Sequence, residues 1–457
     1  MAHLGAQSNS KCTVYFWDKD RLSNLPDSLL CHILSFLSTD GAVVTSILSS
    51  RWKTLWTLVP KIDFQDTSIR GRSVSPLRIL YSVLAQHTTP ILSNFTLSWR
   101  SPCDSSHFDN WVDTAILRNV QTLDLHFECG QLFELPHTVF HCKTLVGLEL
   151  YGEIELDLPP SFQLPSLKIL RLCEICYTSD NSFSSLCSAC PNLEDLTVIY
   201  EFIVGNVNIV SFKISLPFLK RLRIDFISFD TEPPDYKLEI YAPILERFRF
   251  FGYLSNMVFL EKLAHLIEAH FIVCGLGHVF EMCYSDKVFK IVRALNSSKF
   301  LELFPGDVEC IGSGYIYPSM FQNLVRLNFK VTQSNWHVLQ SLLVVAPNLE
   351  VLVLDKHYYR KNQLCWMEPP DGSGCLSSRL TTFNFNGFEE LGHEAEFIKY
   401  ILKEAIILNT ITIKVSALHS KESVLKKLSM FPRHSTTCLL TVEIDSGSLN
   451  LLPNYDK

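Results

Sequence analysis

Four cysteines in this chain have the type and spacing that could bind a metal. Cys173-x-x-Cys176 is followed by Cys187-x-x-Cys190, and two such pairs are typical of a structural zinc site. A second interpretation needs no metal, because Cys173 directly follows a predicted strand and Cys190 lies in the segment that opens the next one. The repeated pattern described below accounts for that context, so we expect no metal and no cofactor.

A second group of residues could suggest catalysis. His107 and Asp109 lie close in sequence to Cys103 and would offer a base beside a nucleophile. Residues 108–125, however, are typical of a helix that leads into a repeated strand. The chain also has no Gly-x-Ser-x-Gly, no P-loop, no His-Glu-x-x-His and no Rossmann glycine set. We therefore expect no catalytic residue and no enzymatic activity.

The elements that would position any functional side chain come from an internal repeat. "SLKILRL" (Ser166 to Leu172) and "FLKRLRI" (Phe218 to Ile224) are two copies of Leu-x-x-apolar-x-apolar. Less regular copies fill one longer gap, and others extend the series at both ends. Units of about 20 to 29 residues with this pattern resemble leucine-rich repeats. In such proteins each repeat adds one parallel strand and a helical or irregular return. The first leucines of the seven clearest copies are Leu145, Leu167, Leu193, Leu219, Leu245, Leu324 and Leu349.

Arginines gather on the side of these strands that faces away from the core. Side chains alternate along a strand, so Arg221 and Arg223 share one face, as do Arg247 and Arg249. The fifth position of successive repeats carries no acid, which leaves Arg223 and Arg249 as an uncompensated pair that Asp225 relieves only in part. We expect either a solvated basic face or a site where these four arginines contact an acidic or phosphorylated target segment. The row at the fifth position is Arg171, Thr197, Arg223, Arg249 and His270.

Short helices are predicted near the start of the chain. Leu29, Leu30, Ile33, Leu34 and Leu37 follow helical spacing, and a second apolar set follows the Asp40-Gly41 break. About forty residues of this kind bury too little surface to be stable alone. They therefore need a partner, and the tryptophans in "LSSRWKTLW" (Leu48 to Trp56) are candidate anchors.

The same stretch resembles an F-box of the kind that opens plant F-box/leucine-rich-repeat proteins. The resemblance rests on Leu-Pro-Asp, then Ile-Leu-Ser-Phe-Leu, then Leu-Ser-x-Arg-Trp-x-x-Leu-Trp, between Asp20 and Phe64. It implies that the unit docks a SKP-type adaptor, and through it a cullin and a RING protein, with Trp52 facing the adaptor. The adaptor-binding residues that it implies are Leu25, Pro26, Leu29, Ile33, Leu48, Trp52 and Leu55.

Residues 365–413 resemble the FBD region that closes many of the same proteins. Cys375-Leu376 and the segment Phe397 to Leu402 carry the resemblance, whereas Gly372-Ser373 departs from it. Glu394 to Leu408 reads as an amphipathic helix that leads into a strand over Thr410 to Val415, and we expect this region to cap the open end of the repeats.

Composition limits the class of protein. The 457 residues include 47% hydrophobic residues, so most of the chain must bury a core. The net charge of −7 argues against a general nucleic-acid binder. Met1 to Asp20 has no apolar core of signal-peptide length, and the uncharged run Ile79 to Trp99 is interrupted by polar residues. We expect an intracellular protein, nuclear, cytoplasmic or both, that is neither secreted nor held in a membrane.

These observations predict an α/β chain with a helical F-box at 20–64, linker and lead-in helices at 65–119, leucine-rich repeats at 120–360 and an FBD region at 365–445. The resemblance implies a substrate-recognition subunit of a ubiquitin ligase, whose repeats hold a target protein. Two alternatives stay open at this point. One is a scaffold whose F-box assembles no ligase, and the other is a co-receptor whose repeats need a small molecule to hold the target.

Overall fold

The computed structural model describes residues 22, 24–66, 75–202, 210–228, 235–274, 282–306, 321–332, 334–356, 366, 368, 374–416 and 420–444. The chain forms two compact units, Met1–Leu97 and Ser98–Lys457. Each is described by itself below.

The first unit is a set of short helices followed by a strand and a longer helix. The elements are α1 (Asp27–Leu34), α2 (Thr39–Val44), η1 (Thr45–Ile47), α3 (Trp52–Leu55), η2 (Trp56–Leu58), β1 (Lys61–Gln65) and α4 (Pro76–Gln86), with β2 (Asn94–Trp99) at its end. The short helices that the sequence predicted are therefore present.

These helices enclose a small apolar core. Trp52 and Trp56 lie in it together with Leu30 and Leu34 of α1. Val83 of α4 completes the cluster, so the helix after the predicted F-box stabilises the short helices. Arg51, at the start of α3, links that helix to α1. Its Nε and Nη2 atoms donate to Oδ1 of Asp27 at 2.8 and 2.5 Å. Nη2 also donates to the carbonyl of Leu25 at 2.6 Å.

The second unit is built on a parallel sheet in which each repeat contributes one strand. Paired neighbours follow the order β3-β5-β7-β9-β11-β13-β15-β16-β17-β18-β19-β20-β21. The first strands are β3 (Thr122–Phe127), β5 (Gly147–Gly152), β7 (Ile169–Cys173), β9 (Asp195–Phe202), β11 (Arg221–Ser228), β13 (Arg247–Gly252) and β15 (Glu268–Val273). The later strands are β16 (Phe300–Phe304), β17 (Arg326–Val331), β18 (Val351–Lys356), β19 (Thr382–Phe388), β20 (Thr410–Val415) and β21 (Leu439–Ile444).

The repeats stack in phase, so like positions lie side by side. Leu196 pairs with Leu222, and Leu222 pairs with Phe248. All three side chains are buried, which joins neighbouring repeats into one continuous core. The predicted repeat strands are thus confirmed, including the less regular ones at β15 and β16.

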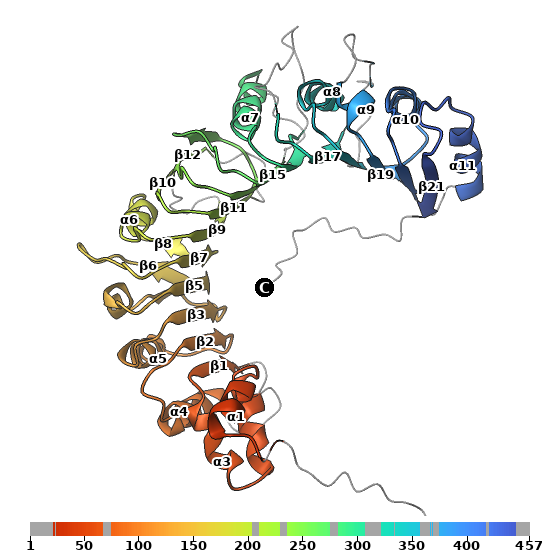
Figure 1. The fold of residues 1–457 in the computed structure, drawn as a ribbon. Coiled ribbons are helices and arrows are strands. Elements are labelled where there is room, and N and C mark those ends of the chain that lie inside the picture. The colour runs from red at the N-terminus through yellow and green to blue at the C-terminus, as the bar shows by residue number, and fades with distance from the viewer. Residues whose placement is uncertain are drawn as a thin grey trace, which may run out of the picture. The chain divides into compact units, whose positions relative to one another are not determined.

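Helices and small sheets cover one side of this main sheet (Figure 1). The helices are α5 (Ser105–Leu117), α6 (Ser182–Ser188), α7 (Met282–Ala294), α8 (Trp336–Val345), α9 (Gly374–Ser378) and α10 (Gly392–Glu404). Several returns between repeats instead form short strands, which the sequence did not predict. They pair as β4 (Phe133–Glu134), β6 (Ile154–Leu156) and β8 (Cys176–Tyr177), and as β10 (Ser211–Ser215), β12 (Lys237–Tyr241) and β14 (Asn256–Phe259). Within the described ranges no helix or small sheet covers the other side, which is called the uncovered face below.

The C-terminal region continues the main sheet. Strand β20 has the bounds that the sequence predicted. Helix α10 begins two residues before the predicted helix, which was Glu394 to Leu408, and ends four residues before its end. Strands β19, β20 and β21 pair in parallel with the repeat strands before them, so this region extends the stack before ending it. Helix α11 (Lys421–Ser429) packs beside β21. Leu439 and Ile444 of this last strand are exposed.

Candidate functional site

The first unit exposes large apolar side chains over a short stretch of sequence. Ile47 is 83% exposed and Phe36 is 75% exposed, whereas side chains of this type are usually buried. Apolar surface of this extent is characteristic of an interaction site. The exposed members are Leu29, Ile33, Phe36, Leu37, Val44, Ile47 and Leu48, and we call them the apolar surface of the first unit.

The structure divides the predicted adaptor-binding residues between this surface and the core. Leu29, Ile33 and Leu48 belong to the apolar surface, and Pro26 is also exposed. Leu25 is partly buried against the core. Trp52 is only 5% exposed and Leu55 is buried, so the expectation that Trp52 faces an adaptor is corrected. Trp52 packs the interior because it lies in α3, next to Leu30 and Trp56 of the same cluster.

The uncovered face of the second unit carries a charged region over β9 to β16. Arg221 Nε donates to Oδ2 of Asp195 at 2.8 Å, and Arg247 lies 3.4 Å from Glu268. Arg171 on β7 is paired with Glu149 on β5, two repeats before the pair of Arg221 and Asp195. Basic and acidic side chains therefore alternate across the strands, and the face is not uniformly basic.

Asp225 overturns the expectation that Arg223 and Arg249 lack an acidic partner. It lies two residues beyond Arg223 on β11 and its side chain is almost fully buried. Arg223 donates to Oδ2 of Asp225 through Nε at 3.0 Å and Nη2 at 2.7 Å. Arg249, paired in register with Arg223, approaches Oδ1 of Asp225 to 3.7 Å. One buried carboxylate thus separates two guanidinium groups that would otherwise repel.

His270 adds a further cation beside this pair. Its Nδ1 lies 2.6 Å from Oε2 of Glu302, and its Nε2 lies 2.8 Å from Oε1 of Glu268. Burial opposes the charge on the ring, but the two carboxylates together outweigh it and raise the pKa of His270. A neutral imidazole could donate to only one of these acids, so the geometry favours the doubly protonated ring.

The four cysteines do not come together as a ligand set. Cys173 lies on β7 and Cys176 on β8, whereas Cys187 and Cys190 are buried at the end of α6. Burial raises the pKa of both Cys173 and Cys190 to about 12. Among the described residues, the four sulfur atoms do not converge within the spacing of a metal site.

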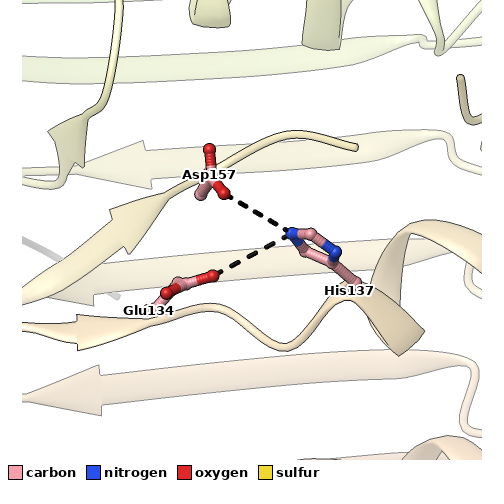
Figure 2. Close-up of side chains that lie close together, drawn as sticks. All are labelled: Glu134, His137 and Asp157. Carbon is pink, nitrogen blue, oxygen red and sulfur yellow. Dashed lines mark ion pairs between the residues drawn. The ribbon is translucent and has the colours of Figure 1, made fainter. Parts of the chain in front are cut away.

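Glu134, His137 and Asp157 are the residues that converge, within the described part of the chain, in a way that could hold a cation. Figure 2 shows His137 between the two carboxylates, with Nε2 at 3.9 Å from Glu134 and 3.7 Å from Asp157. All three side chains are about half exposed. Ion pairing in water accounts for this arrangement, and we treat the group as a surface ion pair.

Sequence reasoning missed two features of these surfaces. Phe36, Val44 and Ile47 were not among the predicted contact residues, although apolar residues on more than one side of the short helices were the signal that could have found them. The second feature is that Asp225 pairs with both Arg223 and Arg249, which the sequence analysis expected only in part. Position 225 lies two residues from Arg223 on one strand, so alternation places both side chains on the same face.

Three family models match separate parts of the chain. The F-box domain matches residues 22–63, the repeats of an FBD-associated F-box protein match residues 108–257, and FBD matches residues 371–413. The first includes the apolar surface of the first unit, and the second includes the arginines of β11 and β13. No helix in the described ranges is both long enough and apolar enough to span a membrane.

Whole-chain relatives agree with these matches. The Arabidopsis thaliana F-box/FBD/LRR-repeat protein At5g56420 is 31% identical over 435 residues, which cover 92% of this chain and 98% of the relative. A second such protein, At3g52680, is 30% identical with 94% and 95% coverage. The FBD-associated F-box protein At3g52670 is 29% identical with 94% and 99% coverage. The order of domains, the repeat stack and the full-length similarity together place this chain in the plant F-box/FBD/LRR-repeat family.

Proposed function

We propose that this protein is the substrate-recognition subunit of a SKP-cullin-F-box ubiquitin ligase. Its F-box docks a SKP-type adaptor, and its repeats hold a target protein for ubiquitination. F-box and leucine-rich-repeat domains in one chain suggest this adaptor role for the family. We propose that the chain acts inside the cell, in the nucleus, the cytoplasm or both.

The apolar surface of the first unit is the observation that supports this proposal most directly. Phe36 and Ile47 project from a small unit whose core is already filled by Trp52, Leu55 and Trp56. When a partner covers exposed side chains of this size, the complex is stabilised by about 25 cal/mol for each Å² of apolar surface buried. An adaptor that covers this surface would remove the exposed apolar area from water.

The predicted adaptor-binding residues then have two roles. Leu29, Ile33 and Leu48 contact the adaptor, with Pro26 and Leu25 at the entry to α1. Trp52 and Leu55 hold the helices that carry these contacts, because both lie in the core. Substituting residues of either kind weakens adaptor binding, but only substitutions in the core also unfold the unit.

The target is proposed to bind the uncovered face of the second unit. Arg223 and Arg249, helped by Arg221 and Arg247, contact it through charge-assisted hydrogen bonds. In this role the protein catalyses nothing. It contributes proximity and orientation, while a separate conjugating enzyme supplies the ubiquitin thioester.

The experiment that tests this function measures capture of a purified SKP-type adaptor and cullin by the full chain. Ile47→Glu should reduce capture by roughly 30-fold. The substitution removes an apolar hot-spot contact worth about 2 kcal/mol and places a charge where the adaptor would bury it. Leu117→Glu is a matched control, since Leu117 is also 83% exposed but lies on α5 in the second unit. Equal capture by both variants, with both well folded, would contradict the adaptor-binding role. Adaptor capture without cullin would favour a scaffold that assembles no ligase.

A further inference from the structure

Arg249 differs from the other arginines on the uncovered face. Within the described part of the chain, its guanidinium makes no hydrogen bond, and its Nε is buried without an acceptor. Its nearest carboxylate oxygen is Oδ1 of Asp225, at 3.7 Å. That oxygen is also buried and accepts no hydrogen bond from a described residue. A ligand cannot reach this buried Nε, but the Arg249 side chain is 32% exposed, so its terminal N–H groups remain available to an acceptor.

The neighbouring carboxylates are already engaged by other cations. Asp225 is held by the two donors of Arg223, Glu268 by His270, and Glu302 by His270. None of them is within hydrogen-bonding distance of Arg249 in the structure. Three acids, Asp225, Glu268 and Glu302, lie among four cations and the ring of His270. The cations are Arg223, Arg247, Arg249 and Lys330.

The other arginines are satisfied or exposed. Arg223 is fixed by its fork to Asp225, and Arg221 donates to Asp195 at 2.8 Å. Arg247 is 65% exposed, so water solvates it, whereas Arg249 is only 32% exposed. Arg249 is therefore the arginine of this group that combines partial burial with an unused pair of donors.

Apolar side chains lie next to Arg249 along the strand. Phe251 is two residues further along β13 and is half-buried. In register it pairs with Asp225 on one side and Ile272 on the other. Ile272 in turn pairs with Phe304. Because a strand rises about 3.3 Å per residue, the backbone positions of Arg249 and Phe251 lie about 7 Å apart on the same face.

We propose that Arg249 and Phe251 form a recognition site for an extended target segment in which an acidic residue lies two positions from a large apolar residue. This inference rests on the proposed function. The acidic side chain accepts two hydrogen bonds from Arg249, because the guanidinium fork matches the two oxygens of a carboxylate. The apolar side chain lies on Phe251, since alternate side chains of an extended segment have the same spacing as Arg249 and Phe251. Arg223 also holds Asp225 in place through Nε and Nη2.

The test uses the purified full chain and a display library of random twelve-residue peptides. We expect selected peptides to contain Asp or Glu two positions from Phe, Leu, Ile or Met. Replacing that acid by its amide should weaken binding at least tenfold. Arg249→Gln should cause a similar loss, and combining the two changes should add little, because they remove the same contact.

Arg326→Gln provides a matched control. Arg326 lies on the same face at the start of β17, and its Nε already donates to Asn328 at 3.2 Å. This variant should bind the selected peptides as the unchanged protein does. Thermal midpoints of both variants establish that folding is preserved.

Three outcomes would overturn the inference: no peptide is selected, the selected peptides lack an acid, or Arg249→Gln leaves binding unchanged. Much tighter binding when phosphoserine replaces the acid would assign the site to a phosphorylated segment instead. Adaptor capture is measured on the same samples. Failure of the unchanged protein to capture the adaptor would contradict the proposed function, whereas intact capture without peptide preference would contradict only this site.

Discussion

Lys356 and Glu394 form a buried ion pair between the last strand of the 120–360 repeat region and the C-terminal region. Nζ of Lys356 on β18 lies 2.6 Å from Oε1 of Glu394 on α10, and their side chains are 5% and 0% exposed. The other oxygen of Glu394 accepts from the backbone N–H groups of Glu389 at 3.0 Å and Leu391 at 3.2 Å. The pair ties the start of α10 to β18.

Removing one partner of this pair should destabilise the C-terminal strands. Lys356→Met leaves the carboxylate of Glu394 buried without its cation, and such changes cost about 3 to 5 kcal/mol. Hydrogen exchange should increase in α10 and β20, while β5 and β7 keep their protection. Lys403→Met is the control, because Lys403 pairs with Glu368 at an exposed position. Equal protection in both variants would show that the pair contributes little.

Trp52→Ala should unfold the first unit. The side chain lies in the core with Leu30 and Trp56, and deleting a buried tryptophan costs about 3 to 5 kcal/mol. Limited proteolysis within residues 24–97 should become rapid, and Trp52→Phe should restore part of the resistance. A protease-resistant Trp52→Ala protein that fails to bind adaptor would instead support direct contact by Trp52.

A charge in the repeat core should disorder several repeats together. Leu222→Asp buries an unpaired carboxylate between Leu196 and Phe248, the residues paired with it on β9 and β13. Leu196→Asp should act in the same way. Hydrogen exchange should increase across β9, β11 and β13 in either variant. An increase confined to the substituted strand would contradict the continuous core.

The charge on His270 should make stability depend on pH. Burial alone would lower the pKa of His270, but Glu302 and Glu268 raise it above the usual value near 6.5. Its contribution to folding is therefore complete below that value and is lost as pH rises through the higher pKa of the folded state. His270→Gln should remove this part of the pH profile of the unfolding midpoint. A profile that is unchanged in the variant would show that the two ion pairs contribute nothing.

The strands of the second unit were predictable because their physical signal is local. Leu196, Leu222 and Phe248 occupy the same position of the repeat, and stacking requires each of them to be buried. Chain order and the Leu-x-x-apolar-x-apolar phase were enough to place them. The short strands at the returns, such as β10 and β12, carry no comparable pattern and pair only because the main sheet brings them together.

The contact residues were harder to predict because burial of similar residue types depends on three-dimensional packing. Trp52 and Ile47 are both large and apolar and lie five residues apart, yet one is buried and the other is exposed. Likewise, alternation places Arg223, Asp225 and Arg249 on one face. The sequence does not show which of the two arginines donates two hydrogen bonds to the carboxylate of Asp225. Side-chain geometry decides that choice.

The pairing of each strand with the next repeat also has a consequence for how the second unit folds. Leu222 pairs with residues one repeat earlier and one repeat later, so the main sheet forms through contacts of modest sequence separation. Low contact order favours rapid folding. During synthesis a new repeat can dock on the preceding one as soon as it leaves the ribosome, and assembly then proceeds in the order of translation from β3 toward β21.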